Sequence, residues 1–112
     1  MFSLVEDMKL NTEFLAYSKE SQVILWLWEI LQEFDQETLA KFLFFVTGSF
    51  KVPYGGFKNF KLKIERLYDG NALPTAHTCF NQLDLPEYES KEKMREKLLV
   101  AILEGNKGFY IC

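Results

Sequence analysis

The stretch that organises this chain reads Leu73-Pro74-Thr75-Ala76-His77-Thr78-Cys79-Phe80-Asn81. Pro74 biases the residue before it towards an extended conformation, and a short run of small and β-branched residues then leads to Cys79. If Ala76 to Cys79 is a strand, side chains two residues apart share one of its faces. His77, the only histidine of the chain, would then point the same way as the thiol of Cys79.

A cysteine in this setting has three interpretations. A thiolate is a strong nucleophile, so Cys79 could accept an acyl group from another thioester, an exchange that is close to balanced in energy. Cys79 could instead be a structural residue of the core, because cysteine is among the most buried residue types. A thiol hydrolase is less favoured, since a histidine two residues away on the same strand has poor geometry to reach the sulfur.

The segment from Leu73 to Tyr88 resembles, nearly residue for residue, the active-site segment of HECT-type ubiquitin ligases. Other stretches agree with the family in the same order along the chain. They are Ile24-Leu25-Trp26-Leu27-Trp28, similar to the family's aromatic first helix; Phe45-Val46-Thr47-Gly48-Ser49 with Lys51-Val52-Pro53 and Gly56-Phe57, similar to its "FVTG…VP…GF" run; and Gly108-Phe109, similar to its terminal motif. The resemblance covers about residues 11 to 112 and is weak between Lys58 and Gly70. The wording around Phe80 to Ser90 is most similar to the very large multi-domain members.

The resemblance implies a two-step transfer centred on Cys79. The cysteine would take the C-terminal acyl group of ubiquitin from a charged ubiquitin-conjugating enzyme and hold it as a thioester. The lobe would then swing on a hinge, and a lysine of a protein substrate would attack the thioester carbonyl. Covalent catalysis of this kind divides one difficult transfer into two easier ones. The implied partners are therefore ubiquitin, the conjugating enzyme and the substrate.

Further site residues follow from the same resemblance. His77 and Thr78 would orient the thioester or its oxyanion, since a positioned donor stabilises the transition state. Asp84 would either aid the incoming amine or hold a turn. Phe109, fourth from the end, would dock the tail and support transfer to lysine, although the chain departs from the family after it. The candidates for binding the donor ubiquitin are Leu73, Thr75, His77 and Thr78, which could alternatively do no more than complete the sheet.

Composition sets the class of protein. The chain has 112 residues, 48% of them hydrophobic and eleven of them Phe, which favours one packed domain. A net charge of -3 argues against a nucleic-acid partner. The charge is uneven, because residues 38–66 carry six bases and one acid, a net +5. This block could face an acidic partner or be a solvated face.

No cofactor or metal site is expected, because two Cys and one His cannot supply the four ligands of structural zinc. The low cysteine content favours a reducing compartment, either the cytoplasm or the nucleus. We expect no membrane contact, since the most apolar run, Leu39 to Val46, is far shorter than the roughly 20 residues that cross a bilayer.

Periodicity predicts an α/β fold. Helical spacing runs from Ser18 or Ser21, from Asp35 to Gly48 and from Ser90 to Gly105, and residues 60–65 alternate as a half-buried strand. Pro86 argues against an interior strand just before it. We therefore expect a compact single lobe of about three helices around a small, mostly antiparallel sheet. Cys79 would lie at a sheet edge or an adjoining loop, where a partner's tail could pair by strand addition.

Residues 1–17 show no clean periodicity. By resemblance we assign them to the end of a missing N-terminal lobe plus the hinge between lobes, and residues 18–112 to the C-terminal lobe. The surface that recruits the conjugating enzyme in this family would then lie outside the chain. Two other functions remain open: a binding module that holds ubiquitin without chemistry, and a plain structural domain.

Overall fold

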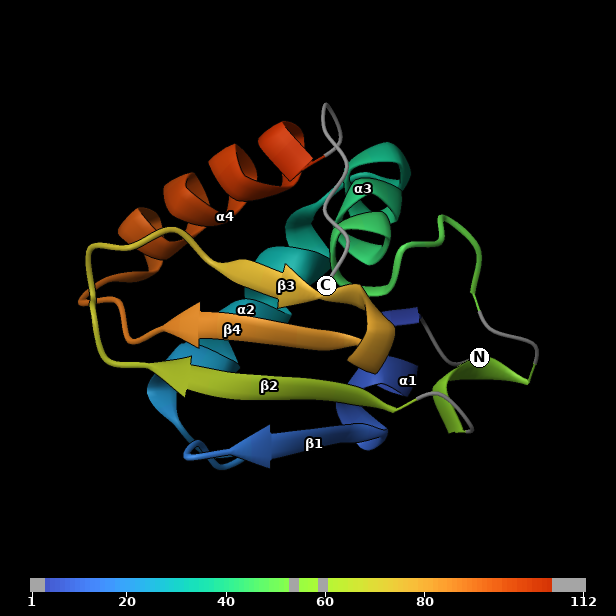
Figure 1. The fold of residues 1–112 in the computed structure, drawn as a ribbon, viewed down its shortest axis with the longest axis horizontal. Helices are drawn as coiled ribbons and strands as arrows, with labels where there is room; N and C mark the ends of the chain where they lie inside the picture. The colour runs from blue at the N-terminus through green and yellow to red at the C-terminus, as the bar shows by residue number, and fades with distance from the viewer. Residues whose placement is uncertain (1–3, 53–54, 59–60, 106–112) are drawn as a thin grey trace.

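The computed structural model describes residues 4–52, 55–58 and 61–105. This part of the chain combines α-helices with the strands of one sheet (Figure 1). In chain order the elements are α1 (Leu4–Leu10), β1 (Thr12–Leu15), α2 (Gln22–Glu33), α3 (Gln36–Thr47), the 3₁₀ turn η1 (Gly56–Lys58), β2 (Leu62–Leu67), β3 (Thr75–His77), the 3₁₀ turn η2 (Thr78–Phe80), β4 (Gln82–Pro86) and α4 (Lys91–Gly105). The predicted α/β class is confirmed.

The sheet is mixed, with the strand order β1-β2-β4-β3. β2 runs parallel to both β1 and β4, and only β3 and β4 are antiparallel. The expectation of a mostly antiparallel sheet is therefore wrong. The reason lies in the connections: α2 and α3 carry the chain back across the sheet between β1 and β2, as parallel neighbours require. β4 is an interior strand despite Pro86, because that proline is its last residue.

The core lies between the sheet and the helices. Figure 1 shows the sheet face on, with α1 and α2 behind it and with α3 and α4 towards its β3 edge. The apolar side chains of β2 and β4 that alternate towards the helices are almost fully buried. The largest fully buried side chains are Phe42, Phe57, Met8, Ile24, Leu27, Ile30, Leu31, Leu83, Leu85, Met94, Leu98 and Ile102.

Several predicted helix ends are confirmed. The Asp35 side chain accepts a 2.7 Å hydrogen bond from the Thr38 amide at the start of α3, and the Ser90 hydroxyl accepts one from the Lys93 amide. Gly48 ends α3 in the left-handed conformation at φ 82°. Trp26, which lies off the main apolar stripe of α2, is partly buried against the core and serves as an extra core contact.

The N-terminal residues are part of the same folded unit. α1 buries Val5 and Met8, and β1 pairs with β2 from Thr12 opposite Leu62. Oδ2 of Asp7 also accepts a 2.9 Å hydrogen bond from the amide of Phe57, fifty residues further on. A helix of seven residues with two buried side chains is too short to show a period, which explains why the sequence did not reveal it. The assignment of residues 1–17 to a preceding lobe and hinge stays a prediction.

Gly56 and Gly48 form a matched pair for testing the contact with α1. Both have φ 82°, so alanine at either position costs about 1–2 kcal/mol of backbone strain. A Cβ on Gly56 would lie 2.7 Å from Oδ2 of Asp7, whereas one on Gly48 would make only ordinary contacts. We expect Gly56→Ala to lower the free energy of unfolding by roughly 1.5–3 kcal/mol more than Gly48→Ala, because it breaks a charged hydrogen bond.

Urea unfolding of the two variants measures this difference. In an Asp7→Ala background the extra cost of Gly56→Ala should disappear, since the colliding carboxylate is gone. Equal losses for the two glycine variants in the unmodified background would contradict the contact.

Candidate active site

Cys79 lies in η2, the tight turn that joins β3 to β4. Strand β3 ends at His77, so the prediction that Cys79 continues the strand on the face of His77 is wrong. Asn81 reverses the chain in the left-handed conformation at φ 53°, which Asn tolerates better than most residues. Its amide donates to the Thr78 carbonyl at 3.3 Å, and its own carbonyl accepts a 2.9 Å bond from the Lys63 amide. The turn is thus tied to β2 as well as to itself.

The thiol-bearing turn faces solvent. Cys79 is exposed, and the neighbouring Phe80 is 59% exposed. The interpretation of Cys79 as a buried structural cysteine is therefore wrong. Thr78 lies close to Gly48 at the end of α3, since a Cβ built on Gly48 would lie 3.6 Å from Cβ of Thr78. The predicted place of Cys79, a loop adjoining the sheet edge, is confirmed.

The approach to β3 is fixed by a buried tyrosine. The hydroxyl of Tyr88 donates a 2.6 Å hydrogen bond to the carbonyl of Ala72, the residue before Leu73. Burial raises the pKa of Tyr88 well above its usual value, so the phenol keeps the proton that it donates. Leu73 itself is 39% exposed, and Thr75 is exposed at the start of β3.

Asp84 gathers a polar cluster on the sheet face opposite the helices. It alternates with the buried Leu83 and Leu85 along β4 and is itself only 8% exposed. Oδ2 lies 2.8 Å from Nε2 of His77 and accepts a 3.3 Å bond from Thr75, while Oδ1 accepts a 2.7 Å bond from Nε2 of Gln82. We call these four residues (Thr75, His77, Gln82 and Asp84) the Asp84 cluster. Asp84 therefore holds no turn, as one interpretation had it, but sits mid-strand.

This contact decides what His77 can offer. An ionised carboxylate can only accept a hydrogen bond, so this contact favours the neutral tautomer of His77 that carries its proton on Nε2 and has its lone pair on Nδ1. The structure thus brings together His77, Thr75 and Asp84 of the predicted site, and places Cys79 and Thr78 in the turn that follows. Phe109 lies outside the described residues.

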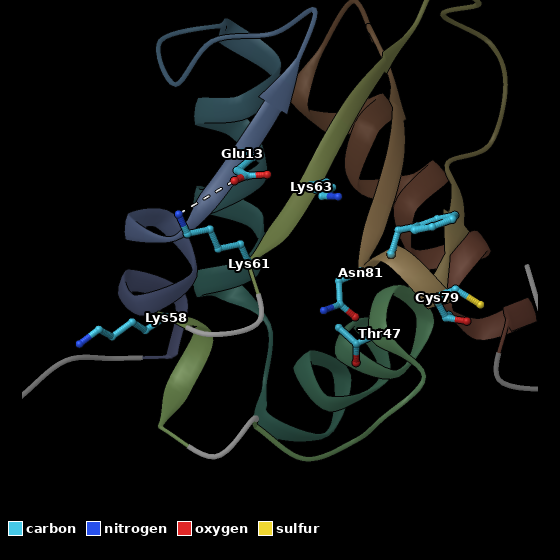
Figure 2. A pocket seen from close by; sticks show the side chains of 9 residues that line it. Glu13, Thr47, Lys58, Lys61, Lys63, Cys79 and Asn81 are labelled. Carbon is cyan, nitrogen blue, oxygen red and sulfur yellow. Dashed lines mark ion pairs between the residues drawn. The ribbon is translucent and has the colours of Figure 1, made fainter.

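A pocket of about 690 Å³ opens beside the turn. It is lined by Glu13, Thr47, Lys58, Lys61, Lys63, Thr78, Cys79, Phe80 and Asn81. Figure 2 shows Cys79 on one side of this pocket, with Lys58 and Lys61 on the opposite side and Lys63 between them. These lysines belong to the positively charged block of residues 38–66, but the charge pattern alone does not predict their position beside the cysteine.

A scan of protein families matches residues 3–112 to the HECT-domain (ubiquitin-transferase) model. The chain belongs to the HECT family. This confirms the resemblance read from the residues around Cys79.

Three relatives show how similar this HECT chain is to named proteins. It is 51% identical to the E3 ubiquitin-protein ligase UPL2 of Arabidopsis thaliana over 93% of the chain, and 50% identical to HUWE1 of Mus musculus over 94%. It is 47% identical to the TOM1-like ligase of Neurospora crassa, again over 94%. The chain spans about 3% of the length of each, so its expected similarity to very large family members is confirmed.

Membrane-spanning helices and metal-binding clusters are both absent from the described residues. No helix there is long and apolar enough to span a membrane. The same part of the HECT chain holds no group of three or more His, Cys, Asp or Glu side chains arranged to bind a metal ion.

The tautomer of His77 tests the Asp84 cluster. We expect the Nε2–H form to dominate in neutral His77, because the carboxylate of Asp84 accepts that proton. Long-range ¹H–¹⁵N spectra of the imidazole report the tautomer directly. Asp84→Ala should remove the preference. Glu65→Gln is the matched control, since Glu65 bonds Gln82 at 3.0 Å and not His77, and it should keep the preference. A dominant Nδ1–H form in the unmodified chain would contradict this geometry.

Proposed function

We propose that this lobe accepts ubiquitin on Cys79 as a thioester and passes it to a lysine of a protein substrate. The observation that carries the proposal is the exposed Cys79 in a fixed turn of a HECT-family chain. In the first step the Cys79 thiolate attacks the thioester carbonyl of the charged conjugating enzyme, whose own thiolate leaves. In the second step a substrate amine attacks the new thioester, and the Cys79 thiolate leaves.

The residues before Cys79 are proposed to hold the donor ubiquitin. β3 is one of the two edge strands of the sheet, where an extended tail could add by backbone hydrogen bonds. Leu73 and Thr75 are exposed, and the His77 side chain is 44% exposed. These exposures support contacts with a tail from outside the chain, in addition to their part in the sheet.

Asp84 is proposed to act through His77. With only 8% of its surface exposed, the carboxylate is poorly placed to meet an incoming amine itself. Its bond to Nε2 instead fixes the ring, so that Nδ1 can orient the thioester or the amine. Thr78, in the same turn as Cys79, remains a candidate for orienting the oxyanion.

The partners and compartment follow from the same mechanism. Ubiquitin, a charged conjugating enzyme and a protein substrate are the proposed partners, the conjugating enzyme binding through the preceding lobe. Because the thiolate is the reactive form, we propose a reducing compartment, the cytoplasm or the nucleus.

Adduct formation tests the first step. The full ligase is mixed with activating enzyme, conjugating enzyme and ubiquitin, and a thiol-sensitive ubiquitin adduct is sought on gels. We expect Cys79→Ala to abolish the adduct, because the sulfur that forms the thioester is lost. Cys112→Ala is the matched control and should keep it. A protein that binds ubiquitin in the Cys79→Ala form, and never forms an adduct in the unmodified form, would be a binding module instead.

The tail tests the second step. Phe109 belongs to the Gly108-Phe109 pair that is similar to the family's terminal motif, in which a phenylalanine supports lysine transfer. We expect Phe109→Ala to leave adduct formation largely intact and to slow discharge to lysine about tenfold or more, on the order of a lost positioning contact. Single-turnover assays separate the two steps. Equal loss of both would count against a role confined to the tail.

A further inference from the structure

The wall of the pocket beside Cys79 is positively charged. Three lysines line it, Lys58 from η1, Lys61 just before β2 and Lys63 on β2, against one acid, Glu13 on β1. The whole chain has a net charge of -3, so this positive field is local to the pocket. Charged walls of one sign concentrate ligands of the opposite sign.

These lysines are poorly neutralised by the rest of the chain. Nζ of Lys61 lies 4.0 Å from Oε2 of Glu13, and both side chains are about half exposed (52% and 54%), so solvent screens the pair. Neither Lys58 nor Lys63 makes a side-chain hydrogen bond or ion pair with another residue in the described ranges. The pocket therefore offers two ammonium groups to a ligand from outside.

The position of the pocket favours the acceptor as that ligand. Cys79 lines one side of the pocket, Lys58 and Lys61 lie across from it, and Lys63 lies between the two sides (Figure 2). An acceptor whose lysine reaches the thioester on Cys79 would lay its neighbouring residues along the basic wall. The acceptor lysine is itself a cation, so like charges in the pocket disfavour its approach unless acidic neighbours compensate.

We propose that this basic pocket selects acceptor segments in which the target lysine is flanked by acidic residues. The inference rests on the proposed function, because it assigns a substrate class to the same cysteine. In the step concerned, the neutral lysine amine attacks the thioester carbonyl, the C–N bond forms and the C–S bond breaks. Cys79 leaves as a thiolate, and the amine proton passes to water.

The test is single-turnover discharge from the full ligase. The ligase is charged with ubiquitin, the conjugating enzyme is quenched, and two peptides of equal length are added. One has Glu or Asp on either side of its single lysine, and the other has Gln or Asn there. We expect the acidic peptide to react about fivefold faster at low salt, the factor of one ion contact in water. The preference should shrink at high salt as screening grows.

Two double variants locate the effect. Lys58→Glu with Lys63→Glu replaces the two lysines that no acid of the described ranges pairs, and it should remove or invert the preference. Lys19→Glu with Lys97→Glu changes the net charge equally, at positions that do not line the pocket, and should preserve it. Rates are expressed per thioester formed, so failure of the unmodified ligase to form a thioester speaks against the proposed function alone.

Three results would overturn the inference. The first is equal discharge to the two peptides by the unmodified ligase. The second is an unchanged preference in the Lys58→Glu/Lys63→Glu variant. The third is a variant that forms less thioester but whose thioester still discharges faster to the acidic peptide. The pocket would then serve ubiquitin or the conjugating enzyme.

Discussion

The structure depends on β4 being hydrogen-bonded on both sides. β4 lies between β2 and β3, so the chain that leaves β3 must turn back at once to fill the middle of the sheet. Thr78 to Asn81 make that reversal, and the Lys63 amide of β2 holds its end. A cysteine in a free surface loop would sample many positions. Here the sheet itself limits where the thiol can lie, because the turn that carries it is bonded at its end to β2.

The Asp84 cluster adds a second constraint, which acts on the strands β3 and β4 that flank the turn. A nearly buried carboxylate is costly unless its oxygens are hydrogen-bonded, and three side chains of β3 and β4 supply those bonds to Asp84. The bonds in turn fix the His77 ring just before the cysteine. Asp84 thus both stabilises the outer face of the sheet and orients His77, a candidate site residue. Only measurements that follow the His77 ring can separate these two roles.

Much of the fold could be predicted from the sequence, and the features that could not be predicted have physical reasons. The faces of α2, α3 and α4 follow from the 3.6-residue period, and Asp35 and Gly48 are local signals at helix ends. Whether neighbouring strands run parallel depends on the long connections between them. Local patterns in the sequence therefore did not predict that β2 runs parallel to β1 and β4. Whether Cys79 continues a strand or lies within a turn depends on the turn formed with its neighbours Thr78, Phe80 and Asn81. The lysine wall joins segments far apart in sequence, and only the folded chain places them together.

The pairing of β1 with β2 has a consequence for how the lobe is made. Thr12 pairs with Leu62, fifty residues further along the chain. The other edge of β2 pairs with β4, which is synthesised later and ends at Pro86. During synthesis the helices can form as they emerge, but the edge of β2 that faces β4 stays open until β4 leaves the ribosome. Open strand edges are the places where unfinished chains adhere to one another. When β4 pairs with β2, the hairpin that carries Cys79 closes this edge and leaves β3 as the new edge of the sheet.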